Sequence, residues 1–139
     1  EPVPQPHRRY LNALRLATIV AETGPLTDYP TPQAALKYAG LNLCMRQSGK
    51  WKGRTAISHK GNALLRKALG KAVLHLVRKD SCYGTYYHGK TDGQHMPGTT
   101  AMTAVMRKML ITIWVLGTRK VAYDEQRLFV AQAQYKSAA

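Results

Sequence analysis

The chain has 139 residues, of which 45% are hydrophobic and 20% charged, a composition typical of one folded domain and not of a disordered chain. Twenty-one Lys and Arg residues oppose seven Asp and Glu residues, which gives a formal net charge of +14. A positive charge this large repels itself unless a polyanion is near, so nucleic acid is the first expected partner and an anionic membrane surface the second.

Cysteine spacing and hydropathy exclude further classes of protein. Cys44 and Cys82 lie far apart and form no Cys-x-x-Cys pattern, so we expect neither a disulfide framework nor a zinc ribbon. The longest uncharged apolar stretch, 109–117, is well short of the ~20 residues that cross a bilayer. We therefore expect no transmembrane helix. Glycines interrupt the basic part of the chain, which forms no long amphipathic helix, so binding to a membrane surface ranks below nucleic-acid binding and we expect no membrane partner.

The first half of the chain predicts three helices. Apolar residues recur at helical spacing over 11–21, and Gly24 with Pro25 ends that segment. Thr31 before Pro32 predicts the start of a second helix, which Gly40 ends. The third helix is the clearest, because an apolar stripe follows its periodicity: Leu65, Leu69, Ala72, Val73 and Leu76.

The second half predicts a central core helix and a final helical segment. Thr100 is the expected N-cap of the core helix, whose apolar residues recur every three or four positions: Met102, Val105, Met106, Met109, Leu110, Ile113 and Leu116. The final segment covers 124–134. We divide the chain into a flexible lead-in over 1–10, a domain over 11–134 and a tail over 135–139.

Two glycine-containing segments interrupt the helical pattern. Residues 42–62 are interpreted as an exposed loop or short ribbon, and residues 81–98 as a second irregular segment. The tyrosines of the second segment, Tyr83, Tyr86 and Tyr87, either pack on the helices, which we favour, or stack on bases. Strand signals are weak, so the predicted fold class is all-α, a compact orthogonal helical bundle with two long glycine-containing loops.

Positive charge is concentrated in one window of the chain. No acidic residue lies between Asp28 and Asp80, a window that holds eleven basic residues: Lys37, Arg46, Lys50, Lys52, Arg54, Lys60, Arg66, Lys67, Lys71, Arg78 and Lys79. This window predicts the electrostatic face that meets phosphates. The alternative is a basic surface that only confers solubility.

Within this window, residues 47–54 combine a hydroxyl, two glycines, Trp51 and three cations. Glycine lets a phosphate approach the backbone, the cations hold it, and Trp51 could stack on a base. The cations beside Ser48 would stabilise an alkoxide and the charge that develops on a phosphoryl group under attack. No general base is evident beside Ser48, and the alternative is a solvated loop hydroxyl.

A second polar cluster, residues 57–62, comes just before the third helix. Backbone N–H groups at the start of that helix could bind a phosphate. The alternative is that Asn62 or Ser58 caps the helix.

The chain also carries an ordered set of motifs: Tyr38–Leu41, Gln47–Gly49, Gly53, Ile57–Asn62 with Leu65, Arg66 and Leu69, Arg107–Met109, Trp114, and Tyr123 with Asp124. In order and spacing, over roughly 14–124, this set resembles the C-terminal domain of the insertion-sequence transposases of the "one-ten" group. These are also called DEDD transposases, and the Piv-like DNA invertases are their relatives.

The resemblance implies a DNA strand-exchange enzyme with a split active site. In that family a nuclease-like domain of the Holliday-junction-resolvase fold supplies four carboxylates and a divalent metal, and the C-terminal domain supplies a serine that links covalently to DNA. On this chain the matching nucleophile is Ser48, with Ser58 as the fallback. The residues expected to hold nucleic acid are Arg46, Lys50, Trp51, Lys52, Arg54, Lys60, Asn62 and Arg66.

The seven acidic residues are too scattered to replace the carboxylate domain. The resemblance therefore implies that Mg²⁺ binds in that missing domain, that this chain binds no cofactor, and that alone it does not cut DNA. The sequence leaves three identities open: a fragment of a longer transposase, one half of a split enzyme, or a domesticated remnant that acts as a non-catalytic DNA- or RNA-binding module.

Further partners follow from the same resemblance. They are the element ends and target DNA, a guide RNA encoded by the element, the carboxylate domain in cis or in trans, and further copies of the chain. The expected setting is the prokaryotic cytoplasm, at the nucleoid.

Overall fold

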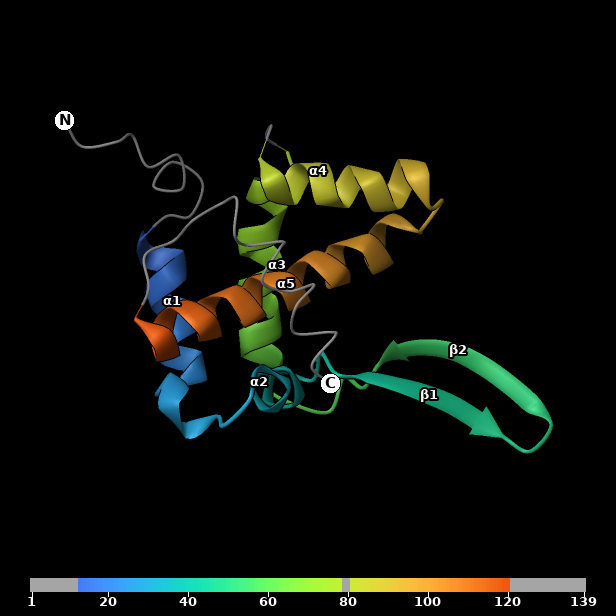
Figure 1. Cartoon of the computed structure of the whole chain (residues 1–139), viewed down its shortest axis with the longest axis horizontal. Coiled ribbons are helices and arrows are strands. Elements are labelled where there is room, and N and C mark those ends of the chain that lie inside the picture. Colours follow the sequence, from blue (N-terminus) through green and yellow to red (C-terminus); the bar gives the residue numbers. More distant parts are fainter. Residues whose placement is uncertain (1–12, 79–80, 121–139) are drawn as a thin grey trace.

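The computed structural model describes residues 13–78 and 81–120, which form a helical bundle with one projecting β-hairpin (Figure 1). In chain order the elements are α1 (Ala13–Thr23), a 3-10 turn (Leu26–Asp28), α2 (Pro32–Ala39), β1 (Leu43–Ser48), β2 (Trp51–Ile57), α3 (Ala63–Leu76), α4 (Cys82–His88), a π-helical turn (Gly89–Gly93) and α5 (Gly98–Arg119). The mostly α-helical fold class is confirmed.

The local signals of α2 and α3 are confirmed. The Thr31 hydroxyl accepts from the Ala34 amide at 3.3 Å, and Gly40 ends α2 in the left-handed conformation with φ of 72°. All five residues of the predicted α3 stripe are buried. These two helices therefore follow from caps and periodicity alone.

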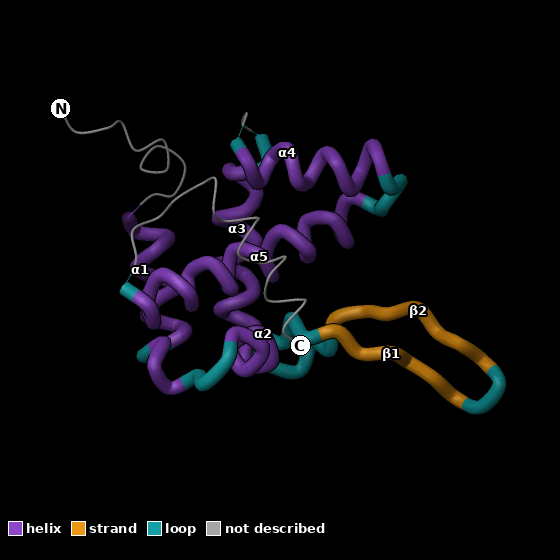
Figure 2. The backbone as a smooth tube through the Cα atoms, viewed as in Figure 1, coloured by secondary structure: helices purple, strands orange, loops and turns teal. Residues whose placement is uncertain are grey.

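The segment 42–62 contains a β-hairpin over 43–57, so of its two interpretations the short ribbon is confirmed and the loop is wrong (Figure 2). Its strands pair antiparallel, from Leu43 with Ile57 at the base to Ser48 with Trp51 at the tip. Leu43 and Met45 on β1 are 56% and 60% exposed, so these strands lack the alternation of buried and exposed residues that marks a strand in a sequence. The weak strand signal reflects this exposure.

The segment 81–98 is also more regular than predicted. The Ser81 hydroxyl caps α4 by accepting from the Gly84 amide at 3.1 Å, and the π-helical turn continues it. Tyr83 is buried, and Tyr86 and Tyr87 pack against the core, so packing of the tyrosines is confirmed. Burial of these rings offsets the low helix propensity of the glycines.

The core forms where α5 crosses the other helices. α5 packs against α2, α3 and α4, and it buries Val105, Met109 and Leu110 of the predicted stripe. It begins at Gly98, after Pro97, so Thr100 lies inside the first turn and the predicted cap is wrong. A proline can precede a helix without a capping side chain because its fixed φ suits the chain entry.

By length and apolar composition, α5 is long enough to cross a membrane, which the uncharged stretch 109–117 did not indicate. It carries Arg107 and Lys108 near its middle and packs on three other helices. A helix with these contacts is the central helix of a folded core.

Helix α1 differs from its prediction in position and in its apolar face. It covers Ala13–Thr23, and of its predicted apolar residues Ile19 is buried whereas Leu14 is 72% exposed. The lead-in, the segment 124–134 and the tail 135–139 lie outside the described residues.

The hairpin joins the bundle at a contact between two glycines, which we call the Gly40–Gly61 junction. A Cβ on Gly61 would lie closer than 3.0 Å to backbone atoms of Tyr38, Ala39 and Gly40. The Asn62 amide donates to the Tyr38 carbonyl at 2.8 Å, and the His59 amide donates to the Gly40 carbonyl at 3.1 Å. The end of α2 and the segment before α3 therefore meet backbone to backbone.

Two arginines fix the chain between α2 and β1. Arg66 of α3 donates from Nη1 to the Ala39 carbonyl at 3.0 Å, and Arg107 of α5 donates from Nη1 to the Leu41 carbonyl. Charged donors to carbonyl groups form stronger hydrogen bonds than neutral donors do. The root of the hairpin is thus held by α3 and α5 together.

We expect Gly61→Ala to lower the free energy of unfolding by about 3 kcal/mol, because its methyl group would clash with backbone and not with a movable side chain. Gly70→Ala in α3 is the control: its Cβ would meet only Met106 Sδ, at 3.9 Å, so it should be neutral or stabilise by up to about 1 kcal/mol. Urea denaturation measures both. A Gly61→Ala variant as stable as wild type would contradict the close backbone contact at the Gly40–Gly61 junction.

Candidate nucleic-acid interface

The Gln47–Ser48–Gly49 motif lies at the tip of the hairpin, the end farthest from the bundle (Figure 1). Gly49 is the first residue of a two-residue loop and has φ of 59°, as the type II′ turn requires. A Cβ on Gly49 would meet nothing within 4 Å, so the glycine serves the turn itself. The turn pairs the Ser48 backbone with Trp51 and the Gln47 backbone with Lys52.

A β-bulge interrupts the hairpin in its middle. Met45 pairs with Thr55 and Gln47 with Lys52, so Arg46 stands opposite two residues, Gly53 and Arg54. A bulge bends its strand and strengthens its twist, and bulges are common beside functional sites. The second glycine of the sequence motif therefore lies at the bulge.

The hairpin also gathers most of the predicted nucleic-acid residues. Five of the eight lie on it by their position in the strands and the turn: Arg46, Lys50, Trp51, Lys52 and Arg54. Lys50 is exposed in the turn, and Lys60 is exposed just beyond the base. The cations therefore extend from the tip of the hairpin to its root.

The fallback nucleophile, Ser58, lies at the opposite end of the hairpin from Ser48. At about 3.3 Å per residue, the seven steps from position 51 to 58 separate the two by roughly 20 Å. The Ser58 hydroxyl donates to Asn42 Oδ1 at 2.5 Å and accepts from the Lys60 amide at 3.3 Å. The hydroxyl proton of Ser58 therefore already takes part in a hydrogen bond at the base of the hairpin.

Asn62 caps α3, and a capping role is one of the two interpretations that the sequence left open for the segment before this helix. Its Oδ1 accepts from the Leu64 and Leu65 amides at 2.9 and 3.0 Å. Its Nδ2 donates to Glu22 Oε2 at 3.2 Å and to the Tyr38 hydroxyl at 3.3 Å. The side chain of Asn62 therefore binds both α1 and α2, and its contact with nucleic acid stays a prediction.

Arg66 and Arg107 have structural partners as well. Arg66 donates from Nη1 to the Ala39 carbonyl, and its contact with nucleic acid stays a prediction. Arg107 belongs to the sequence motif Arg107–Met109, and its hydrogen bond to the Leu41 carbonyl is not among the predictions from the sequence. Burial lowers the pKa of Arg107, and the nearby Tyr86 phenol acts in the opposite direction. The signal that could have indicated this role is the charged pair Arg107 and Lys108 within the apolar stripe of α5.

Within residues 13–78 and 81–120, no three His, Cys, Asp or Glu side chains lie close enough together to hold a metal ion. Glu22 is bonded to Asn62, and Asp92 pairs with His88 at 3.8 Å. Mg²⁺ prefers an octahedral set of oxygen ligands with one or two carboxylates. The acidic residues described do not fit that set.

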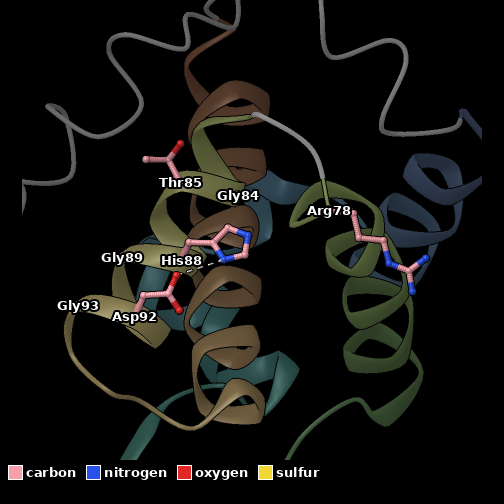
Figure 3. A pocket seen from close by; sticks show the side chains of 7 residues that line it. All are labelled: Arg78, Gly84, Thr85, His88, Gly89, Asp92 and Gly93. Atoms are coloured by element: carbon pink, nitrogen blue, oxygen red, sulfur yellow. Dashed lines mark ion pairs between the residues drawn. The ribbon is translucent and has the colours of Figure 1, made fainter.

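One open groove of about 480 Å³ lies beside α4, away from the hairpin (Figure 3). Figure 3 shows His88 and Asp92 side by side on α4 and the π-helical turn, with Arg78, which lies just after the end of α3, across from them. The predicted nucleophiles are not among its lining residues. The groove is therefore separate from the hairpin site.

Residues 12–88 match the model of a protein family described as the IS116/IS110/IS902 transposases. No curated protein matches the chain. The matched residues run from α1 to the end of α4 and include the whole hairpin. Because the match covers more than half of the chain, the chain belongs to this transposase family.

We expect Asn62→Ala to lower the free energy of unfolding by about 1–2 kcal/mol, because α3 loses its N-cap. Asn62→Asp, which keeps a capping oxygen but places a carboxylate beside Glu22, should recover only part of this loss. Thermal or urea unfolding of the three proteins gives the comparison. An Asn62→Ala variant as stable as wild type, with weaker nucleic-acid binding, would show that Asn62 acts on the ligand instead.

Proposed function

We propose that this chain is the strand-transfer domain of its transposase, with Ser48 as the nucleophile and the hairpin as the arm that brings it to DNA. The observation that best supports this proposal is the two-residue turn. It pairs the backbone of Ser48 with that of Trp51 and holds Lys50, at the tip of an exposed hairpin. Cations around a serine stabilise the pentacoordinate phosphoryl group that forms when its oxygen attacks.

The proposed step exchanges one phosphoester bond for another. A bond forms between Ser48 Oγ and the phosphorus, the bond from phosphorus to the leaving sugar oxygen breaks, and that oxygen takes up a proton. Between Asp28 and His59 the sequence holds no carboxylate or imidazole, so the base that accepts the Oγ proton comes from outside this stretch. A carboxylate domain, in cis or in trans, would supply it.

The other expected partners belong to the same proposal. Element-end and target DNA would lie along the basic hairpin, and a guide RNA would bind the remaining basic surface. A carboxylate domain that binds Mg²⁺ and further copies of this chain would complete the active site, in the cytoplasm of a prokaryote. The residues described here would hold and orient nucleic acid and supply the serine.

A non-catalytic DNA- or RNA-binding module is the second candidate function. It is favoured by the absence of acidic residues from 29 to 79, which attracts any polyanion whether or not a serine reacts. The two candidate functions make different predictions for Ser48: in a module that only binds nucleic acid, replacing Ser48 would not change the activity of the protein.

We expect a covalent protein–DNA adduct when the chain is combined with a carboxylate domain of the family, Mg²⁺, element-end DNA and element-encoded RNA. Ser48→Ala should abolish the adduct on a denaturing gel and leave binding nearly unchanged, whereas Ser58→Ala should retain it. An adduct that survives in Ser48→Ala and disappears in Ser58→Ala would move the nucleophile to Ser58. Binding without any adduct would support the non-catalytic module.

We expect Lys50→Glu combined with Arg54→Glu to weaken DNA binding several-fold at low salt, because the hairpin loses and reverses two charges. Lys67→Glu combined with Lys71→Glu on α3 makes the same change of charge away from the hairpin and should weaken binding less. Fluorescence anisotropy at several salt concentrations measures both. Equal losses would show that total charge, not the hairpin, governs binding.

A further inference from the structure

The solvent-exposed face of α3 carries a straight row of three cations, which we call the α3 row: Lys67, Lys71 and Arg78. The two lysines lie within the helix, and Arg78 follows Val77, the C-cap, which keeps right-handed helical angles. At 3.6 residues per turn the three positions fall within an arc of about 40°, on the side of α3 opposite its buried stripe. At 1.5 Å per residue the row extends over roughly 16 Å.

No carboxylate neutralises the α3 row within residues 13–78 and 81–120. Helix α3 itself contains no acidic residue. Of the three acidic side chains described, Glu22 bonds to Asn62 and Asp92 pairs with His88. The third, Asp28, lies in the 3-10 turn after α1 and forms no ion pair with a described residue. The row therefore presents its full positive charge.

The arrangement of these cations is unfavourable for the helix alone. Like charges four residues apart on a helix face repel each other, and Lys67 and Lys71 have this spacing. A surface that only confers solubility intersperses charges of both signs, whereas this arc carries one sign. A bound polyanion removes the repulsion, because each cation then faces a negative charge.

Arg78 extends the row to the edge of the groove beside α4. Although Arg78 lines that groove, Figure 3 shows its side chain pointing away from His88 and Asp92. Its guanidinium is therefore not used by the acidic residue of the groove. The row thus ends in a cation with the planar donor geometry that suits phosphate.

The α3 row and the hairpin have different directions. Figure 1 shows the hairpin projecting from one side of the bundle, whereas α3 runs across the bundle from the root of the hairpin toward α4. A straight segment of nucleic acid that follows the hairpin cannot also follow α3. An anion on the α3 row therefore belongs to another segment.

We propose that the α3 row binds the phosphodiester backbone of a second nucleic-acid segment, separate from the one on the hairpin. This inference rests on the proposed function, in which the hairpin holds the first segment. Ammonium and guanidinium groups are donors for phosphate, and contacts to phosphate do not depend on base sequence. The row has three cations and binds more weakly than the hairpin, which carries four by position: Arg46, Lys50, Lys52 and Arg54.

The test counts the nucleic-acid segments that the complete chain binds when the ligand is in excess at low salt, by native mass spectrometry. The ligands are a random-sequence DNA duplex of ten base pairs, about 34 Å long, a single-stranded RNA of ten nucleotides, and their mixture. Wild type should bind two segments in at least one sample, and the sample that does so identifies DNA or RNA on the row. Wild type that binds at most one segment in every sample would overturn the proposal.

A variant of the row separates it from the hairpin. Lys67→Gln, Lys71→Gln and Arg78→Gln combined should reduce the count from two to one, as should Lys50→Glu combined with Arg54→Glu. If the row variant still binds two segments while the hairpin variant binds one, this inference fails and the hairpin function stands. If the hairpin variant still binds two while the row variant binds one, the hairpin function fails instead.

Two controls separate the row from total charge and from folding. Lys37→Gln, Arg119→Gln and Lys120→Gln combined remove the same two lysines and one arginine from exposed positions outside the row, and this variant should still bind two segments. A count of one would show that total charge governs binding and would overturn the proposal. Lys67→Arg combined with Lys71→Arg keeps the charges of the row and should also bind two; a count of one would assign the effect to packing and overturn it.

Discussion

The structure depends on the contact between Gly40 and Gly61, where two backbone segments meet with no side chain between them. A two-stranded hairpin is at best marginally stable by itself in water, so its orientation has to come from its root. Here the root is fixed by backbone hydrogen bonds from Asn62 and His59 across the junction. The candidate site residues on the hairpin are therefore positioned through this contact.

Around the junction, polar side chains use their hydrogen bonds within the chain. Arg66 and Arg107 bind carbonyl groups on either side of Gly40, and Asn62 joins α3 to Glu22 and Tyr38. These residues belong to the same motif set as Ser48, yet their contacts show that they build the support of the hairpin. The motifs thus divide into a group that supports the root of the hairpin and a group at its tip that includes Ser48, the proposed nucleophile.

Sequence reasoning succeeded where the signals are local. Thr31, Pro32 and Gly40 mark α2, and the apolar period marks α3, because caps and stripes act within a few residues. It left open whether 42–62 is a loop or a ribbon, because the exposed Leu43 and Met45 give no alternation. It did not predict α4, a helix that contains Gly84 and is stabilised by packing.

The candidate site was also only partly predictable. The turn at Gly49 is a local signal, so the grouping of Ser48 with Lys50 and Trp51 follows from the sequence. The partners of Arg66 and Asn62 lie 27 and 40 residues away in the chain, and no local pattern indicates such contacts. The contacts that Arg66 and Asn62 make within the chain therefore could not be predicted, and their contacts with nucleic acid stay predictions.

The most direct test of the account is to map the residue that carries the covalent bond to DNA. Trypsin cuts after Arg46, Lys50, Arg54 and Lys60, so Ser48 lies in the peptide 47–50 and Ser58 in the peptide 55–60. Mass spectrometry of the digested adduct, after nuclease trimming to one nucleotide, should place the added mass on peptide 47–50. The added mass on peptide 55–60, or on any other peptide, would contradict a nucleophile at the tip of the hairpin.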